Sequence, residues 1–533
     1  MKQYLLVSFL SIAFTAPAWN VSDEPTRRSA LIEEFTGIHC PNCPDGHRVA
    51  ARLNALHPDD VYVVSVHAGY YAQPYPTEPD FRTETGEAVH DQFGINSYPC
   101  AVISRSDFGS GFVTGRSSWG SACREATRDM SPVNLWSACS YDPAGRMLHV
   151  DVEGFLTEDM TDPRLSVWLL QSEIAGPQSG GGLGVEYPHR HMLRASLTEG
   201  AFGEAVDVKA SGEYFSRSVD YALPESINGI AVDPVNIELL CFVSEGEGGS
   251  VYKVSACRPA TAELEQPFVV SFSAPDLVIS KNYAFDYLEV YIENHGGVEV
   301  NSAEFNVTLN GKLTPVEWTG AVAPHSSALV RLPLDGAWAE AIDNDANKYT
   351  VRMMNANGKD VETASISGQF NEIFEYPAEM SVKIKTDVDA ADNSWRILDS
   401  KGEVVKEFGP YPDGESAEYT ESVSLEPGAI YALEIFDRWG DGVRHPSGYM
   451  KLYDMDGKSV AQLREINGYG VRQFFRTATE AGVADAMAER TVIAEEYIDL
   501  GGRSVAAPGP GIYLLRTSYS DGKTEYSKKI ISK

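Results

Sequence analysis

Two cysteines in the segment Cys40–Cys43, which reads Cys-Pro-Asn-Cys, are the residues of this 533-residue chain best suited to chemistry. A short apolar segment, Ala30–Phe35, precedes them, and a segment with helical periodicity, Arg48–Leu56, follows. Free backbone N–H groups and the dipole at a helix N-terminus stabilise a thiolate and lower its pKa. We therefore expect Cys40, on the exposed side of the turn, to be the nucleophile in thiol–disulfide exchange. Cys43, one turn inside the helix, would be the resolving thiol.

A second segment, Phe93–Pro99, comes just before an expected strand at Ala101–Ser104. It resembles the thioredoxin segment whose cis-proline lies against the dithiol and holds an extended peptide substrate. The resemblance implies that Pro99, together with Tyr98, positions a substrate strand. Only about 5–6% of X–Pro bonds in folded proteins are cis, so the sequence alone does not show whether the Tyr98–Pro99 bond is cis.

The Cys-Pro-Asn-Cys motif is compatible with more than one role. A static disulfide in a domain kept for its shape would use the same motif, because fold does not imply function. Cys100, directly after Pro99, could be a third thiol beside the dithiol or a small buried residue, which is the commoner fate of cysteine. The seven cysteines stand at positions 40, 43, 100, 123, 139, 241 and 257. Seven is odd, so at least one thiol is free or pairs transiently.

Alternating strand and helix patterns position the dithiol. Val61–Val66 is a nearly continuous β-branched run, as a buried parallel strand should be. Helices are expected at Arg82–Phe93 and Ser118–Asp129, with a Pro- and Tyr-rich loop at Ala68–Pro79. A βαβ start followed by a hairpin and a closing helix is a thioredoxin-like topology, which we assign to residues 19–131.

The rest of the chain is expected to be β, because helix patterns nearly vanish after Pro132. The length favours three to five domains, so the predicted fold class is multidomain: a thioredoxin-like α/β domain, several all-β sandwich or jelly-roll domains and a small β C-terminal sorting domain. The expected divisions are a β-sandwich at 132–260, an immunoglobulin- or fibronectin-like β-sandwich at 261–375, a jelly-roll-like domain at 376–478, a linker at 479–490 and a compact β tail at 491–533.

Residues 1–18 have the pattern of a secretory signal peptide. Lys2 supplies the positive charge, Tyr4–Phe14 the short apolar region, and Ala16–Ala18 the small-x-small cleavage site. Export would place the cysteines in an oxidising compartment. The formal charge, 43 basic minus 76 acidic residues, is −33. This charge repels phosphate backbones, so nucleic acid is not an expected partner.

A turn at Asp437–Gly442 follows the expected strand Tyr431–Phe436. Asp437 and Asp441 could supply oxygen ligands to calcium. The alternative is a tight turn held by hydrogen bonds to aspartate side chains. This segment resembles a jelly-roll accessory module common in secreted proteins of Bacteroidetes.

Two blocks carry a family-level resemblance. Glu33–Gly37 leading into Cys40–His47, and Tyr187–Ala195, resemble the Bacteroidetes outer-membrane protein family named for its 28-kilodalton founding antigen. The resemblance covers roughly residues 29–260. It implies a surface antigen or adhesin. The resemblance therefore indicates where the protein is located better than it indicates any chemical activity. In the second block, His189 and His191 stand two apart on an expected strand, so both could face one side. A metal site there would need further ligands; a packed or hydrogen-bonded pair is the alternative.

The tail contains three ordered blocks, Tyr497–Val505, Pro510–Arg516 and Tyr526–Ile531. Together they resemble the type IX secretion C-terminal sorting domain, which implies a translocon that reads the tail as an address. An ordinary terminal β module would show the same alternation and turns.

Two functions are consistent with these patterns. The first is an exported thiol–disulfide oxidoreductase that acts on envelope or extracellular proteins and peptides. The second is a non-enzymatic adhesin or antigen attached at the outer-membrane surface, with Cys40–Cys43 as a structural disulfide. The sequence contains no G-x-S-x-G, H-E-x-x-H or P-loop motif. Neither function requires a cofactor, and calcium is the one candidate ligand.

Overall fold

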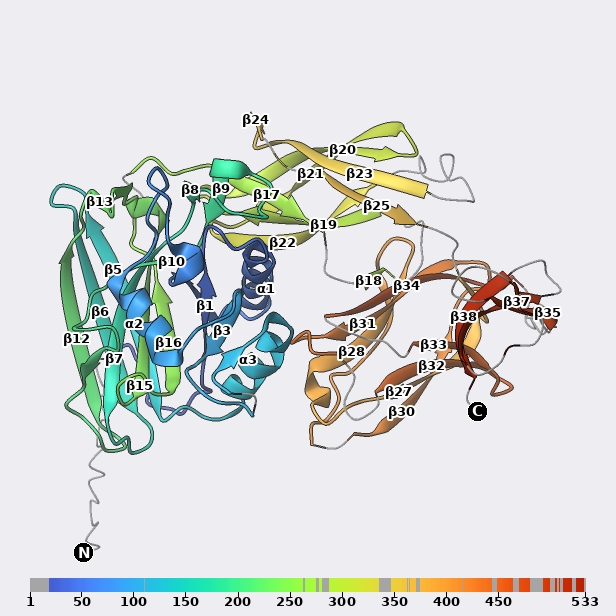
Figure 1. Cartoon of the computed structure of the whole chain (residues 1–533), viewed down its shortest axis with the longest axis horizontal. Helices are drawn as coiled ribbons and strands as arrows, with labels where there is room; N and C mark the ends of the chain where they lie inside the picture. Colours follow the sequence, from blue (N-terminus) through green and yellow to red (C-terminus); the bar gives the residue numbers. More distant parts are fainter. Residues whose placement is uncertain are drawn as a thin grey trace, which may run out of the picture.

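The computed structural model describes residues 19–479 apart from 110, 262–263, 275–277, 280–286, 335–346, 362, 364, 371–373, 415, 443–447 and 464–468. In the tail it describes 492–498, 504–505, 508, 511–519 and 524–531. The signal-peptide prediction (1–18) and all but the first residue of the predicted linker lie outside the described residues. Within the described part the chain is mostly β and is built from several sheets (Figure 1). None of the described helices is long and apolar enough to cross a membrane.

A nine-stranded sheet runs through the N-terminal half, in the order β16-β15-β7-β10-β2-β1-β3-β4, with β11 paired to β7. Its strands are β1 (Ala30–Thr36), β2 (Val61–His67), β3 (Cys100–Ile103), β4 (Val113–Thr114), β7 (Pro163–Gln171), β10 (Met192–Ser196), β11 (Glu204–Ala205), β15 (Ile237–Glu245) and β16 (Val251–Cys257). β1 is parallel to β2 and antiparallel to β3, and β3 is antiparallel to β4.

Three helices cover the β1 region: α1 (Cys43–Leu56), α2 (Glu84–Phe93) and α3 (Trp119–Arg128). Side chains alternate along β1, so Leu31 and Phe35 pack into one core and Ala30 and Ile32 into another. The first core includes Val89 of α2, and the second includes Leu53 of α1 and Trp119 of α3. Both faces of β1 are therefore buried.

The predicted boundary at 131/132 does not separate two sheets. β10 pairs with β2 through Met192 and Ser65, and β10 also pairs with β7. A three-stranded sheet, β12-β6-β5, packs on the β7–β15 half of the large sheet. Its strands are β5 (Val133–Asp142), β6 (Met147–Leu156) and β12 (Tyr214–Ala222). The regions expected as separate domains, 19–131 and 132–260, therefore share one sheet.

The next region, 265–370, packs two sheets around one core. One sheet contains β17 (Val270–Ser273), β19 (Tyr287–Asn294) and β22 (Ser326–Pro333); the other contains β20 (Val300–Leu309), β21 (Lys312–Val322), β23 (Asn347–Ala356), β24 (Lys359–Asp360) and β25 (Ile366–Phe370). Asn310 and Gly311 join β20 to β21 with φ of +47° and +85°, as expected of a tight hairpin.

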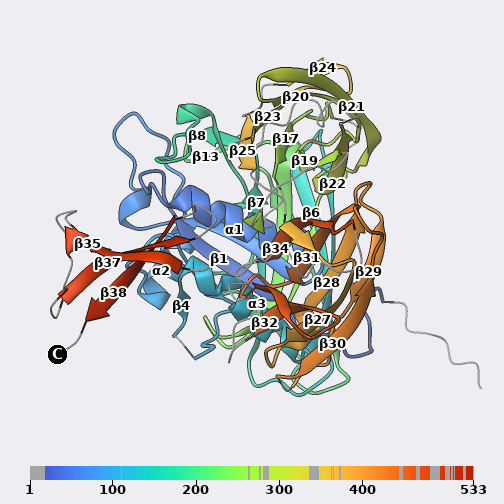
Figure 2. The ribbon, with the colours of Figure 1, turned by 90° about the vertical axis from the view of Figure 1, so that its right-hand side faces the viewer.

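The region 374–479 forms another two-sheet unit. One sheet contains β26 (Phe374–Tyr376), β28 (Asn393–Asp399), β29 (Val404–Phe408), β31 (Ile430–Asp437) and β34 (Gly470–Thr477), with β18 (Val278–Ile279) paired to β34. The other contains β27 (Glu379–Lys385), β30 (Glu418–Ser424), β32 (Tyr449–Asp454) and β33 (Ser459–Leu463). Figure 2 shows the 265–370 region (yellow-green) above this unit (orange).

The described tail residues form a four-stranded antiparallel sheet in the order β36-β35-β37-β38. Its strands are β35 (Val492–Ile498), β36 (Ser504–Val505), β37 (Gly511–Tyr519) and β38 (Thr524–Ile531).

Candidate functional site: a covered dithiol and an acidic turn

The dithiol lies between the end of β1 and the start of α1. Cys40 and Cys43 are joined as a disulfide with 5.4 Å between their Cα atoms. The helix begins at Cys43, so this residue opens the helix and does not lie one turn inside it as predicted. Pro44 suits the first helical turn. The Cys40 N–H donates to the carbonyl of Gly37 at 3.0 Å, which closes the turn.

Cys40 is not on an exposed side of this turn, contrary to the prediction. Its exposed fraction is 1%, and that of Cys43 is 0%. A loop that contains Gln178 and Ser179, from the region 132–260, covers the motif. Gln178 Nε2 donates to the Cys40 carbonyl at 2.9 Å, and Ser179 N–H donates to the Ile38 carbonyl at 2.8 Å. The burial comes from a segment far away in sequence, which local helix and turn patterns do not reveal.

Gly180 fixes how closely this loop approaches the dithiol. Its φ is +77°, a conformation that favours glycine, and a Cβ there would collide with the carbonyl of Pro41. Gln178 is itself 5% exposed, so the loop is packed in place over the motif. Within the described structure, therefore, the disulfide is closed and covered.

A buried carboxyl group lies under the first turns of α1. Glu34 is 1% exposed, and a Cβ added to Gly46 would lie 2.6 Å from Glu34 Oε1 and 2.8 Å from Pro99 Cβ. Burial raises the pKa of Glu34 well above its ordinary value, although a hydrogen bond with Ser65 opposes the shift. Glu34 and Pro99 thus meet beside the helix one turn after Cys43.

The Tyr98–Pro99 bond is cis, and Pro99 is buried. The Tyr98 hydroxyl donates to the carbonyl of Ala68 at 3.1 Å and lies 2.8 Å from His90 Nε2. The polar end of Tyr98 is therefore held by the protein itself. Cys100, which could have been a third thiol, is 2% exposed and packs with Phe35 in the core on the α2 side, where burial raises its pKa to about 12.

The two histidines of the second block do not share a face. His189 ends β9 (Tyr187–His189) at 2% exposure, with its ring 5.1 Å from that of His67. His191 has a φ of +50°, which breaks the strand alternation, and its Nδ1 lies 3.2 Å from Glu238 Oε2. Tyr187 instead reaches α1, where its hydroxyl lies 2.7 Å from His47 Nδ1.

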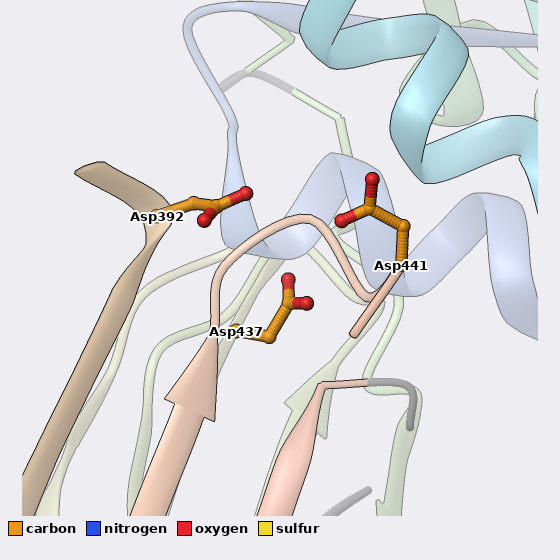
Figure 3. A group of neighbouring side chains, drawn as sticks. All are labelled: Asp392, Asp437 and Asp441. Carbon is orange, nitrogen blue, oxygen red and sulfur yellow. The ribbon is translucent and has the colours of Figure 1, made fainter. Parts of the chain in front are cut away.

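The acidic turn brings three carboxyl groups together. Ligand oxygens of Asp392, Asp437 and Asp441 all lie within 4.8 Å of one another, and Figure 3 shows the carboxyl groups turned toward one another. Asp437 also holds the turn, as in the alternative reading: it accepts the N–H of Trp439 at 2.9 Å, of Gly440 at 2.7 Å and of Gly442.

Burial and mutual repulsion keep these acids from ionising easily. Burial, with the Asp437 charge added, raises the pKa of Asp392 to about 8. Burial, with the Asp441 charge added, raises the pKa of Asp437 to about 7. This is the pattern of a carboxylate cluster short of positive charge.

Arg124 of α3 partly neutralises the carboxyl cluster. Its Nη1 lies 2.7 Å from Asp441 Oδ2 and 3.2 Å from Asp392 Oδ2, and its Nη2 lies 2.9 Å from Asp389 Oδ2. The guanidinium therefore joins the N-terminal unit to the 374–479 unit, and α3 lies beside the ends of β28 and β31 in Figure 1.

Sequence reasoning identified the dithiol, Pro99 and the turn but missed three partners. Gln178, Arg124 and Asp392 come from segments distant from the groups they contact. No local signal points to them. Glu34 could have been noticed, because two adjacent glutamates, Glu33 and Glu34, inside a buried strand are unusual unless they have partners or a role.

Comparison with protein families identifies the class. Residues 86–262 match the family described as outer membrane protein Omp28. The match bears out the predicted resemblance to this family over the residues matched and, with it, the predicted exported, outer-membrane surface location. The dithiol itself precedes the matched region.

Solved structures with similarity include HBP35 of Porphyromonas gingivalis, at 15% identity over 65% of this chain and 99% of that chain, with a TM-score of 0.36. A domain of the outer membrane lipoprotein Omp28 from Porphyromonas gingivalis is 19% identical over 24% of this chain and 88% of that chain, with a TM-score of 0.18. No curated protein sequence matches this chain.

Proposed function

We propose that this chain is a binding protein of the outer-membrane surface, and that its thioredoxin-like N-terminal unit holds Cys40–Cys43 as a structural disulfide. The strand order β2-β1-β3-β4, with β2 parallel to β1 and with helices on both faces, supports the thioredoxin-like assignment. The observation that carries the function is the cover over the dithiol. Exchange requires a thiolate to reach a substrate sulfur, and the Gln178 loop blocks that approach.

Thiol–disulfide exchange on envelope or extracellular proteins is the second candidate. The position of Pro99 and Glu34 beside the first turns of α1 favours it. In that function Cys40 attacks a substrate disulfide, Cys43 resolves the mixed disulfide, and Tyr98 and Pro99 hold the substrate strand. The cover would have to move away before each cycle.

The two functions differ in how fast the folded protein exchanges. In the full chain, dithiothreitol should reduce Cys40–Cys43 slowly. The Gly180→Ala variant should be reduced faster by roughly tenfold or more, which corresponds to lowering the free energy of local opening by about 1.4 kcal/mol. Gly182→Ala is the matched control, because Gly182 has a φ of +74° but nothing within 4 Å of its Cβ position.

A trapping experiment decides between the candidates. If the disulfide is structural, the Cys43→Ser chain should capture few envelope proteins as mixed disulfides at Cys40. Abundant capture by Cys43→Ser, together with rapid reduction of the native chain, would overturn the structural reading in favour of exchange.

Export of the chain is proposed to depend on its tail. The three blocks of 491–533 support a type IX sorting signal, with the translocon as partner. Deleting 491–533 should retain the protein in the periplasm, as measured by protease accessibility on intact cells. Normal surface exposure of the truncated protein would remove this assignment.

Calcium binding at the acidic turn is also proposed. The convergence of Asp392 with Asp437 and Asp441 favours it, because hard cations take carboxylate oxygens. Arg124 occupies one side of the same cluster, so a calcium ion would compete with the guanidinium.

A further inference from the structure

Two cysteines outside the dithiol face each other where the two sheets of the N-terminal half meet. Cys139 lies on β5, the last strand of the three-stranded sheet, and Cys257 ends β16, the first strand of the nine-stranded sheet. Both are partly buried and neither forms a disulfide in the structure. They pack against the same core between the sheets.

The strand register places their side chains opposite each other. Ser137 Oγ and Ser255 Oγ lie 2.8 Å apart, and the isolated bridge between Ser140 and Ala260 shows that the two chain segments run in the same direction. Residues two apart on a strand point to the same face. Cys139 therefore points the same way as Ser137 on β5, and Cys257 the same way as Ser255 on β16, which brings the two cysteines together.

The two thiols are in direct contact. A side-chain hydrogen bond joins them, and it lowers the pKa of Cys257 while it raises that of Cys139. Cys241, on the neighbouring strand β15 and opposite Ser255, is fully buried in the same core.

We propose that Cys139 and Cys257 form a second disulfide in the exported protein, which staples the edge of the three-stranded sheet to the edge of the nine-stranded sheet. The bond would close a loop between residues 139 and 257 that holds nearly the whole second region. Export, the partly buried position and the facing sulfurs are the grounds for it.

The reaction needs an oxidant, which is a disulfide donor of the oxidising compartment. The thiolate of one cysteine attacks one sulfur of the donor disulfide and releases one donor thiolate. The thiolate of the other cysteine then attacks the protein sulfur of the mixed disulfide and releases the second donor thiolate. The Cys139–Cys257 bond forms, the donor bond breaks, and two electrons pass to the donor, whose two thiolates take up the two protons.

Disulfide mapping of the full-length chain tests this proposal. The folded protein is first reduced, freed of reductant and treated with glutathione disulfide as the probe; free thiols are then alkylated during unfolding, and the peptides are identified by mass spectrometry. The expected result is a peptide pair linked through Cys139 and Cys257, with Cys100, Cys123 and Cys241 alkylated. Alkylation of both Cys139 and Cys257, or a link from either one to Cys241, would overturn the proposal.

Single variants test whether the two thiols resolve each other. In Cys139→Ser glutathione should accumulate on Cys257, and in Cys257→Ser it should accumulate on Cys139, because in each variant the resolving thiol is missing. The Cys241→Ser control should form the link as the unchanged protein does. If a variant does not fold, the mapping of the unchanged chain still decides the proposal.

Discussion

The imidazole of His57 stacks on the indole of Trp439, with ring centroids 3.7 Å apart and planes inclined by 6°. His57 follows α1, and Trp439 lies in the acidic turn, so this contact docks the 374–479 unit on the unit that holds the dithiol. The His57 Nε2–H donates to the carbonyl of Arg438 at 3.0 Å, which fixes the neutral ring in place.

Docking through His57 should weaken in acid. Burial lowers the pKa of His57 from its ordinary 6.5 to about 4. Because the folded-state pKa of His57 is below the unfolded value, the unfolded chain takes up a proton first as the pH falls. The contribution of His57 to the stability is therefore full above pH 6.5 and is lost as the pH falls toward 4. Between pH 7 and 4.5 the unchanged chain should therefore lose on the order of 2–3 kcal/mol more than His57→Phe, which keeps a stacked ring that does not titrate. Calorimetric unfolding at both pH values measures this difference. Equal losses in the two proteins would show that His57 does not titrate at the contact.

Gly120 of α3 should resist substitution although it lies in a helix. Alanine normally stabilises a helix interior by roughly 0.5–1 kcal/mol relative to glycine. At this position a Cβ would collide with the carbonyl of Trp439, so Gly120→Ala should instead destabilise the chain by about 1–3 kcal/mol. Thermal unfolding measures the sign, and Ser121→Ala on the same helix is the control. A stabilised Gly120→Ala chain would mean that the turn does not pack against α3 in solution.

Local pattern was sufficient for the elements around the dithiol. The apolar run at Ala30–Phe35 and the β-branched run at Val61–Val66 are the two parallel strands, because burial on both faces leaves a nearly continuous apolar signal. The hairpin at Asn310 and Gly311 was equally visible, since its two positive φ angles call for those residue types.

Contacts between distant segments could not be predicted in this way. Gln178 reaches Cys40 across 138 positions, and Arg124 reaches Asp392 across 268. In the shared sheet β10 pairs with β2 through Met192 and Ser65, and no periodicity encodes this pairing. The sequence therefore located the dithiol and the acidic turn. It did not reveal the loop that covers the dithiol, the arginine that pairs with the acids or the strand pairing that joins the two parts of the sheet.

Glu34 should make the chain less stable as the pH rises. Its folded-state pKa is raised by burial, so the stability that it contributes is full below the unfolded pKa and is lost as the pH rises through the folded value. Over that window the loss is up to about 1.4 kcal/mol per pH unit. Glu34→Gln, a neutral side chain of the same shape, should lack this dependence. Urea midpoints from pH 5 to 9 test it against Glu84→Gln, which changes an exposed carboxylate. Parallel curves for the unchanged chain and Glu34→Gln would contradict the assignment.

The last prediction concerns competition between calcium and Arg124 at the acidic turn. Millimolar calcium should raise the melting temperature of the full chain, because an ion that binds only the folded state stabilises it. Arg124→Met removes the guanidinium that now neutralises the cluster. This variant should be less stable without calcium, and calcium should raise its melting temperature more than that of the unchanged chain, since the ion no longer displaces a positive charge. Arg128→Met is the control, because Arg128 is half-exposed and pairs with Asp389 outside the three-carboxyl cluster.

Removing the ligands tests the same site from the other side. In the Asp437→Asn, Asp441→Asn double variant the amide oxygen at position 437 can still accept the N–H groups of Trp439 and Gly440, while the bond from Gly442 is lost. Neither amide supplies the negative charge that a divalent cation needs. The calcium-dependent rise should then vanish, whereas Asp456→Asn, at an exposed turn of the same unit, should keep it. An equal rise in all of these proteins would place calcium elsewhere on this acidic chain. No rise in any of them, Arg124→Met included, would contradict the calcium site and leave the turn as a structural contact between the two units.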